Sequence, residues 1–495
     1  MQQLSSMDAS FIYTETPFTP QHLGGFSIYD PSTAPGGKVG FKDLLRYIEG
    51  RLDGARIFRQ KLVHVPFDLD HPYWIEDENF DLEYHVRHIA LPKPGDWRQL
   101  CIQIARLYSR PLDMTKPLWE FTVIEGLDNI EGVPKGSFAM LQKMHHAAMD
   151  GKSGLEMSLA LLDSDPKMKP RNFNRKWKPE SAPSPLSLLA KAYINNVRSP
   201  IRGARNLTNL FSIPQRVQEV RKQFPQREDA KTKVPKTRFE RKISPHRVWD
   251  GRSFPIADIK TIRSAFPGAT VNDVMIAVVS GSMRSYLDSV GELPDTTMKV
   301  AVPISVRDEK DSDAAGNQVS VMFVGCGSHL PEAGERLRFV VEETKRSKAM
   351  SEAVGAKTLM EVNGSMPAGL MAAGFKTLAR YKVAGTVNQG MNTYLTNVPG
   401  APGKLYLAGA DAVTSFGAGI LMEGWGIFHT ATSYDGKVYL SVLADREALP
   451  DPANYANMMQ QSFDDLLEAA SKSSTEQTAR KIAKARPRKT KGSAK

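Results

Sequence analysis

The residues best suited to chemistry lie in one short segment, MLQKMHHAAMDGKSG, at positions 140–154. Two adjacent histidines, His145 and His146, follow an apolar run, and Asp150 and Gly151 come shortly after them. Histidine is the side chain whose ordinary pKa allows it to accept a proton near neutral pH. A neutral imidazole held at the end of a strand is therefore suited to act as a general base. We take this segment as the candidate active site.

The other residues of the segment admit more than one role. Asp150 either orients a histidine directly, or caps the helix that follows and holds the loop through an ion pair. Gly151 allows the chain to turn sharply into that helix. A structural role for the two histidines also stays open, because a histidine at a strand end is more often structural than catalytic.

Zinc binding is a rival interpretation, since His and Asp are zinc ligands, but a closed site needs a third or fourth ligand. No second cluster at ligand spacing occurs among the remaining histidines, which are His22, His64, His71, His85, His88, His246, His329 and His429. We therefore expect neither a metal nor another cofactor. The sequence also has no G-x-S-x-G elbow and no Walker loop, so serine hydrolases and nucleotide-driven enzymes lack support.

The elements around the segment are predicted to alternate between helix and strand. The two histidines fall where a strand of residues 136–144 passes into a loop, and apolar spacing predicts a helix over 153–162. A partner strand is expected at 118–127, and helices are expected at 41–52 and 97–110. Residues 1–165 thus form an N-terminal half that carries the histidines.

Residues 247–470 resume the alternating pattern as a second half. Helices are expected at 270–287, with Asn272 at the start, at 336–350 and at 455–470, and strands at 298–307, 403–413 and 435–445. Neither an internal repeat nor a second His-His pair occurs. One active site built from two unlike halves is the simplest arrangement.

Charge is distributed unevenly along the chain. The net charge is +11, yet the stretch from Lys167 to Arg247 has 21 Lys/Arg against 5 Asp/Glu, and residues 471–495 have 9 against 1. We therefore expect a basic linker at 166–246, with an amphipathic helix at 186–211 interrupted at Pro200, and a basic, disordered tail. Such segments suit polyanionic surfaces, either anionic lipid or nucleic acid. Nucleic acid is disfavoured because no recognised binding motif accompanies the charge.

Composition predicts a cytoplasmic protein. The longest apolar runs, such as residues 274–279, are far below the roughly 18 residues that a membrane span requires. The first ten residues have neither the basic nor the apolar region of a secretory signal. Only Cys101 and Cys326 are present, which fits a reducing compartment.

Several motifs together carry a resemblance to a known family. HHAAMDG at 145–151 matches H-H-x-x-x-D-G, the signature of acyltransferases with the chloramphenicol-acetyltransferase-like fold. PLW at 117–119, ND at 272–273 and NVPG at 397–400 resemble further motifs of bacterial wax ester synthase/diacylglycerol acyltransferases. LSSMDASFIYTET, QHLGGFSIYD and VPISVRDE resemble other segments of that family. The chain departs from it at NVPGAP, where proline often follows the glycine directly, and in its long basic tail.

The resemblance implies a fold and a reaction. The fold would be a mixed α/β (α+β) pair of chloramphenicol-acetyltransferase-like halves with the active site in a tunnel between them. Long-chain acyl-CoA would be the co-substrate, and a fatty alcohol or diacylglycerol the acceptor, giving wax ester or triacylglycerol. His146, the second histidine of the pair, would act as general base.

The resemblance also implies supporting roles for the other residues of the motif. Asp150 would form an architectural ion pair with Arg307, and His145 would be structural or would assist catalysis. Asn272 either donates a hydrogen bond in the active site or caps its helix, and capping is favoured because Asn is a strong N-cap residue.

Substrate binding is assigned to Gly151, Trp119 and Asn397. Trp119 would either lock a strand or line the acyl channel, and Asn397 would shape a turn together with Gly400.

The basic linker and tail would attach the enzyme peripherally to an anionic membrane or lipid-body surface. Two alternatives stay open. One is a condensation-type transferase that uses a carrier-bound thioester, and the other is a non-catalytic protein that binds neutral-lipid bodies.

Overall fold

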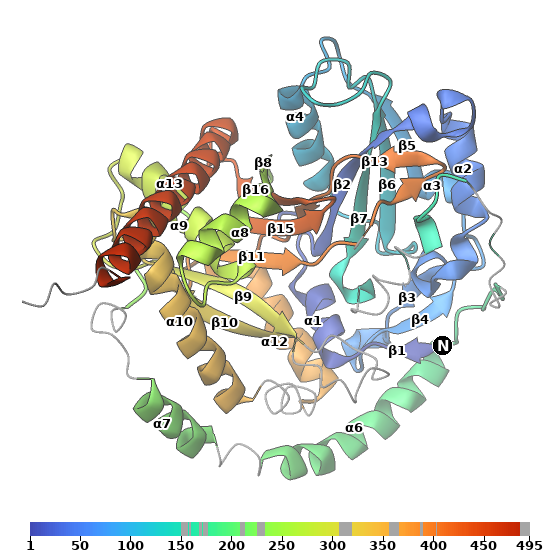
Figure 1. The fold of residues 1–495 in the computed structure, drawn as a ribbon. Coiled ribbons are helices and arrows are strands. Elements are labelled where there is room, and N and C mark those ends of the chain that lie inside the picture. The colour runs from blue at the N-terminus through green and yellow to red at the C-terminus, as the bar shows by residue number, and fades with distance from the viewer. Residues whose placement is uncertain are drawn as a thin grey trace, which may run out of the picture.

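Two large β-sheets and their helices make up the protein (Figure 1). The structure is a computed structural model that describes residues 1–149, 157, 160–167, 171, 177–207, 213–224, 233–305, 319–355, 366–386, 390–401 and 403–485. None of the helices in these ranges is long and apolar enough to cross a membrane.

The N-terminal sheet has seven strands. Its order is β12-β13-β2-β7-β6-β5, and β14 pairs with β2 as well. The central strands β2, β7 and β6 are antiparallel, whereas β5 runs parallel to β6. Helices α2 and α4 bury their apolar faces in the same core as these strands. The bounds are β2 His22–Asp30, β5 Val86–Ala90, β6 Trp119–Glu125, β7 Phe138–His145, β12 Tyr406–Leu407, β13 Ala410–Ala412, β14 Phe416–Ala418, α2 Phe41–Glu49, α3 Leu82–His85 and α4 Trp97–Tyr108.

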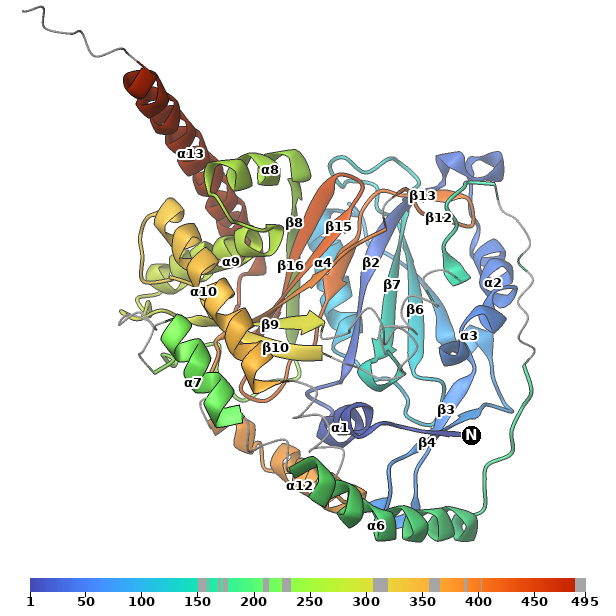
Figure 2. The ribbon, with the colours of Figure 1, turned by 60° about the horizontal axis from the view of Figure 1, so that its bottom comes forward.

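The C-terminal sheet has six strands in the order β10-β9-β11-β15-β16-β8. Helices α8, α9, α10 and α13 cover the side of this sheet that faces away from the N-terminal sheet (Figure 2). The bounds are β8 Arg247–Pro255, β9 Lys299–Ser305, β10 Val319–Gly325, β11 Thr393–Val398, β15 Ile427–Tyr434, β16 Lys437–Asp445, α8 Ile256–Ala265, α9 Val271–Ser289, α10 Ala333–Val354 and α13 Pro452–Ala485.

Smaller elements complete the fold along one edge. Helix α6 lies along the lower edge in both views (Figures 1 and 2), and α12 lies near that edge in Figure 2. A three-stranded sheet of order β1-β4-β3 lies beside α1. The bounds are β1 Gln2–Gln3, β3 Gln60–Val63, β4 Tyr73–Glu76, α1 Ser6–Thr14, α6 Pro185–Leu207, α7 Ile213–Gln223 and α12 Ala368–Arg380.

The chain crosses between the two halves near its C-terminal end. Strand β14 pairs with β2, and Phe416 lies opposite Phe26. The ring of Trp249, from β8, packs edge-on against Phe26 with ring centroids 4.9 Å apart. The expected division of the chain at residues 166–246 stays a prediction, but the stretch from β12 to β14 belongs to the N-terminal sheet.

Three local expectations were wrong. Helix α6 continues through Pro200, although a proline inside a helix removes one hydrogen bond and often kinks or breaks the helix. The expected strand at 403–413 is a hairpin of β12 and β13, since Ala408 and Gly409 have positive φ angles of 50° and 84° and turn the chain. Helix α13 runs on to Ala485, whereas a disordered tail was expected from 471, and the residues after 485 lie outside the described ranges.

The pairing of β14 with β2 requires a glycine at position 25, which gives a test of the fold. A Cβ atom there would lie 2.0 Å from the carbonyl oxygen of Phe416. We expect Gly25→Ala to lower the free energy of unfolding by about 1–3 kcal/mol, the usual cost of overpacking. Thermal unfolding of the purified protein measures this loss.

Gly374→Ala on α12 is the matched control, because a Cβ atom there meets nothing within 4 Å. In a helix this change is neutral or stabilising. Equal melting temperatures for Gly25→Ala and the wild type would contradict the close approach of the two strands.

Candidate active site

The two histidines lie at the end of the central strand of the N-terminal sheet. His145 is the last residue of β7, and His146 opens a short 3₁₀ turn, η6 (His146–Ala148). The backbone N–H of His145 donates to Leu118 O on one side at 3.0 Å. The N–H of His146 donates to Gln21 O on the other side at 2.8 Å. Both flanking strands therefore fix the backbone of the pair.

Both ring nitrogens of His145 have hydrogen-bond partners inside the protein. Its Nδ1 accepts a hydrogen bond from the N–H of Ala147 at 3.1 Å, so Nε2 carries the proton and donates to Glu15 Oε2 at 2.6 Å. The residue is 1% exposed. His145 therefore holds the turn that carries His146 and offers no free nitrogen to a substrate.

His146 has the opposite character. Its ring stacks on Phe11 of α1, with ring centroids 3.8 Å apart and an interplanar angle of 12°. Nδ1 is buried without a hydrogen-bond partner, and no described residue bonds to Nε2 either. Burial lowers the pKa of His146 to about 4, so the ring is neutral at physiological pH.

An apolar cluster surrounds the turn. Ala147 packs in one cluster with Leu118, Ile12 and Tyr13, and Ala372 of α12 belongs to it as well. This packing places His146 in a largely dry environment, where hydrogen bonds and charges act more strongly than in water.

Trp119 locks the neighbouring strand. Its indole Nε1 donates to Phe58 O at 3.1 Å, and its ring stacks on His85 with centroids 4.5 Å apart. At 1% exposure it shows no face to solvent in this structure. The strand-locking role suits these contacts, and contact with the acyl chain stays a prediction.

Asn272 does not cap its helix. Thr270 is the N-cap of α9, and Thr270 and Asp273 form a reciprocal capping box. The Oδ1 atom of Asn272 is buried with no hydrogen-bond partner. The capping alternative was wrong, and an unsatisfied buried amide is the type of group that a functional role explains. No hydrogen bond, ion pair or ring contact among the described residues joins Asn272 to the two histidines.

The NVPG motif lies at the end of β11. Asn397 pairs with Ala431 of β15, and the N–H of Gly400 donates to Ser433 Oγ at 3.0 Å. A Cβ atom on Gly400 would lie 1.5 Å from Ser433 O, so only glycine fits there. Substrate binding by Asn397 stays a prediction.

Three predicted residues lie outside the described ranges, namely Asp150, Gly151 and Arg307. The ion pair between Asp150 and Arg307 and the role of Gly151 therefore stay predictions. Within the described ranges, no group of three or more His, Cys, Asp or Glu residues could hold a metal ion.

Comparison with known proteins decides the family. The sequence model of the wax ester synthase/diacylglycerol acyltransferase catalytic domain matches residues 4–275, and that of the C-terminal domain matches 315–467. The chain belongs to this family. A Mycobacterium bovis protein with a provisional diacylglycerol O-acyltransferase name is 31% identical over 481 residues, which cover 95% of this chain and 100% of the relative. A Mycobacterium tuberculosis protein named in the same way is 28% identical and covers 95% of this chain and 91% of its own.

Solved structures confirm the two-half α/β fold. The wax ester synthase/diacylglycerol acyltransferase from Marinobacter aquaeolei VT8 superposes with a TM-score of 0.65 at 24% identity, over 95% of this chain and 100% of that one. The first condensation domain of the CDA synthetase gives a TM-score of 0.52 at 13% identity, over 95% of each chain.

Sequence reasoning missed two residues of the site, Phe11 and Glu15. Both lie in the segment LSSMDASFIYTET, which resembled the N-terminus of the family. That resemblance was the available signal, but it assigned no role, because contacts over more than 100 residues are set by the fold.

The dry environment of His146 predicts its titration. We expect its ring resonances in NMR spectra of protein with labelled histidine to stay unchanged from pH 8 to about pH 5.5 and to titrate near the pKa of about 4. The sign follows from burial, which penalises the charged form. Phe11→Ala opens the ring to water and moves the midpoint up towards 6.5.

Phe41→Ala is the matched control, because Phe41 stacks on His88 with ring centroids 4.6 Å apart elsewhere on the protein. It leaves the midpoint of His146 where it was. A wild-type midpoint near 6.5 would contradict the burial of the ring.

Proposed function

We propose that the protein transfers a long-chain acyl group from acyl-CoA to the hydroxyl of a lipid alcohol, with His146 as general base. The observation that carries this proposal is the neutral ring of His146, which stacks on Phe11 at a fixed strand end and forms no hydrogen bond with a described residue. Membership in the family supplies the reaction class. The relatives named above support an acyltransferase that makes neutral lipid.

Nε2 of His146 is the ring nitrogen that can accept a proton from a substrate. Because Nδ1 is buried, the acceptor hydroxyl hydrogen-bonds to Nε2 of His146. The hydroxyl oxygen attacks the thioester carbonyl carbon while its proton passes to the ring. The carbon–sulfur bond then breaks, and the imidazolium returns the proton to the departing thiolate. Ester and free CoA thiol are the products, and neither a covalent enzyme intermediate nor a metal takes part.

The low pKa of His146 keeps the base unprotonated but makes its protonated form unstable. A neutral ring is always ready to accept a proton, but a charged imidazolium is unstable in a dry pocket. Attack and proton transfer therefore proceed together, so that the developing negative charge offsets the positive one. A positioned base contributes on the order of 10²–10⁴-fold in rate.

The tetrahedral intermediate needs a donor for its oxyanion. We assign this role to the Nδ2 amide group of Asn272, which can donate a hydrogen bond and is not needed to cap its helix, since Thr270 is the N-cap of α9. Such a donor contributes on the order of 10²–10³-fold. The two halves would then each supply one group, with the substrates in a tunnel between them.

Two alternatives are less well supported. A condensation-type transferase shares the fold, and a structure of the starter condensation domain of rhizomide synthetase, with a TM-score of 0.52, contains C8-CoA. This neighbour supports a CoA thioester as donor in the same fold. A non-catalytic lipid-body protein would have no need for an intact H-H-x-x-x-D-G motif.

The first test is thiol release from palmitoyl-CoA by the purified protein. It is run with hexadecanol, with dipalmitoylglycerol and without acceptor. We expect acceptor-dependent release that falls by about 10²–10⁴-fold in His146→Ala, because the base is lost. The two acceptor rates rank wax ester against triacylglycerol synthesis.

His88→Ala is the control, since His88 lies on β5 and contacts Glu125. It keeps wild-type activity. Equal thiol release by the wild type and His146→Ala would show that the two histidines have a structural role only.

We also propose peripheral attachment to an anionic membrane or lipid-body surface on the cytoplasmic side. The basic linker and tail support it, since each basic residue near such a surface contributes on the order of 1 kcal/mol. Helix α6 adds an apolar outer face, where Leu186, Tyr193 and Val197 are 78%, 73% and 58% exposed. The inner face of α6 packs through Leu188 and Ala192.

Vesicle flotation at low salt tests this attachment. We expect the wild type to float with phosphatidylglycerol-containing vesicles. A variant lacking residues 471–495, with linker lysines and arginines changed to glutamine, should float about tenfold less because the electrostatic attraction is lost. Vesicles of neutral lipid are the control, and unchanged flotation of the variant would rule out the electrostatic contribution.

A further inference from the structure

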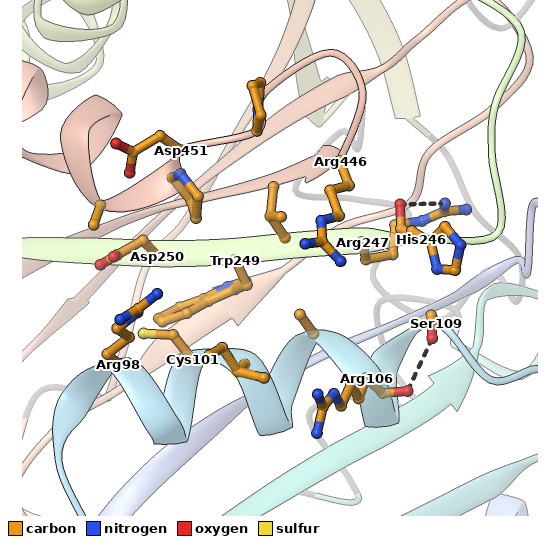
Figure 3. Close-up of a pocket in the computed structure, with 16 residues that line it drawn as sticks. Arg98, Cys101, Arg106, Ser109, His246, Arg247, Trp249, Asp250, Arg446 and Asp451 are labelled. Atoms are coloured by element: carbon orange, nitrogen blue, oxygen red, sulfur yellow. Dashed lines mark hydrogen bonds between the residues drawn. The ribbon is translucent and has the colours of Figure 1, made fainter.

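A cleft of about 710 Å³ lies where the two halves meet, between helix α4 and strand β8 (Figure 3). Its third wall is formed by residues 446 and 450–453, which lead into α13. The cleft does not contain His145 or His146, and nothing above has given it a role.

The two ends of the cleft differ in charge. The indole Nε1 of Trp97 donates to Asp250 Oδ1 at 3.0 Å, which places the start of α4 beside Asp250. The end of α4 therefore lies beside the start of β8. The N–H of Arg446 donates to His246 O at 3.1 Å, which brings Arg446 to the same end. We call Arg106, His246, Arg247 and Arg446 the cationic end (Figure 3).

Two guanidinium groups at this end have no partner among the residues that the structure describes. Arg106 and Arg446 are exposed, and neither side chain forms a hydrogen bond or ion pair with any residue that the structure describes. Arg247 differs, because it donates to Ser244 O at 2.6 Å and to Phe18 O. Unpaired guanidinium groups in a shared cleft present fixed forks of donors that match phosphate oxygens.

The carboxylates that line the cleft do not neutralise the cationic end. Asp250 accepts from Arg252 at 3.0 Å as well as from Trp97. Asp451 accepts from the N–H of Asn454 at 3.1 Å at the start of α13. Both carboxylates have partners at the opposite end of the cleft. The positive potential at the cationic end can therefore attract an anion.

The cationic end is also the end nearer to the two histidines. The carbonyl of Tyr108, the last residue of α4, accepts from His22 Nε2 at 2.7 Å. His22 lies directly opposite His145 in the pairing of β2 with β7. Two packed residues, Tyr108 and His22, thus separate the cationic end from His145.

We propose that the cationic end binds the phosphate groups of acyl-CoA, so that the pantetheine arm and its thioester extend towards His146. This inference rests on the proposed function for its choice of ligand. Arg106 and Arg446 are positioned to bind the phosphates and take no part in the chemistry.

The experiment compares Arg106→Ala/Arg446→Ala with the wild type in two assays. In the first, calorimetry measures the binding of CoA itself. In the second, acyl transfer is measured with palmitoyl-CoA and with palmitoyl-N-acetylcysteamine, a thioester that has no phosphate. We expect the double variant to lose about ten- to a hundredfold in CoA affinity and in kcat/KM for palmitoyl-CoA, through a raised KM. The phosphate-free thioester should react equally well with both proteins.

Lys260→Ala/Lys348→Ala is the matched control, since it removes the same charge from exposed positions on α8 and α10. It should bind CoA like the wild type. Wild-type CoA affinity in the arginine variant would overturn the proposal, and so would an equal loss with both thioesters. A loss of binding to phosphatidic acid vesicles without a loss of CoA affinity would assign the site to a lipid headgroup and overturn it as well.

The two proposals fail differently. If the wild type transfers acyl groups from neither thioester, the proposed function fails, while calorimetry with CoA still decides the role of the cationic end.

Discussion

The site depends on how the end of strand β7 is held. The N–H groups of His145 and His146 donate to opposite neighbours, Leu118 and Gln21, so neither residue can rotate without breaking a hydrogen bond to a flanking segment. The side chain of His145 then fixes the turn through Ala147 and Glu15. The ring of His146 then lies stacked on Phe11. Precise placement of a base is worth more than its intrinsic basicity when two substrates must meet beside it.

The second constraint is the crossing of the chain between the halves. Strand β14 brings Phe416 back to β2, and Gly25 allows the two backbones to approach closely. Trp249 of β8 packs in the same aromatic group, and α4 lies against β8. The relative position of the halves is therefore set by buried aromatic contacts, on which any path between them depends.

The sequence predicted the fold class and the strand that carries the histidines, because both depend on local periodicity and on a motif. It could not predict the contacts that define the site. Asn272 looked like a cap since Asn is a common N-cap residue, yet Thr270 stands two positions earlier and pairs with Asp273. Glu15 lies 130 residues from His145. The cleft beside α4 could not be predicted for the same reason. Arg106 and Arg446 are far apart in the sequence, and the fold brings them to the same cleft.

The arginines of the cationic end lie away from His146, and electrostatics gives a reason for this separation. A cation beside His146 would lower the pKa of the ring further, because like charges disfavour its protonated form. A phosphate-binding group therefore belongs at a distance from the base, and the arginines at the cationic end lie beyond Tyr108 and His22 rather than against the ring. A long substrate with its charge at one end and its reactive carbonyl further along its length suits such a division.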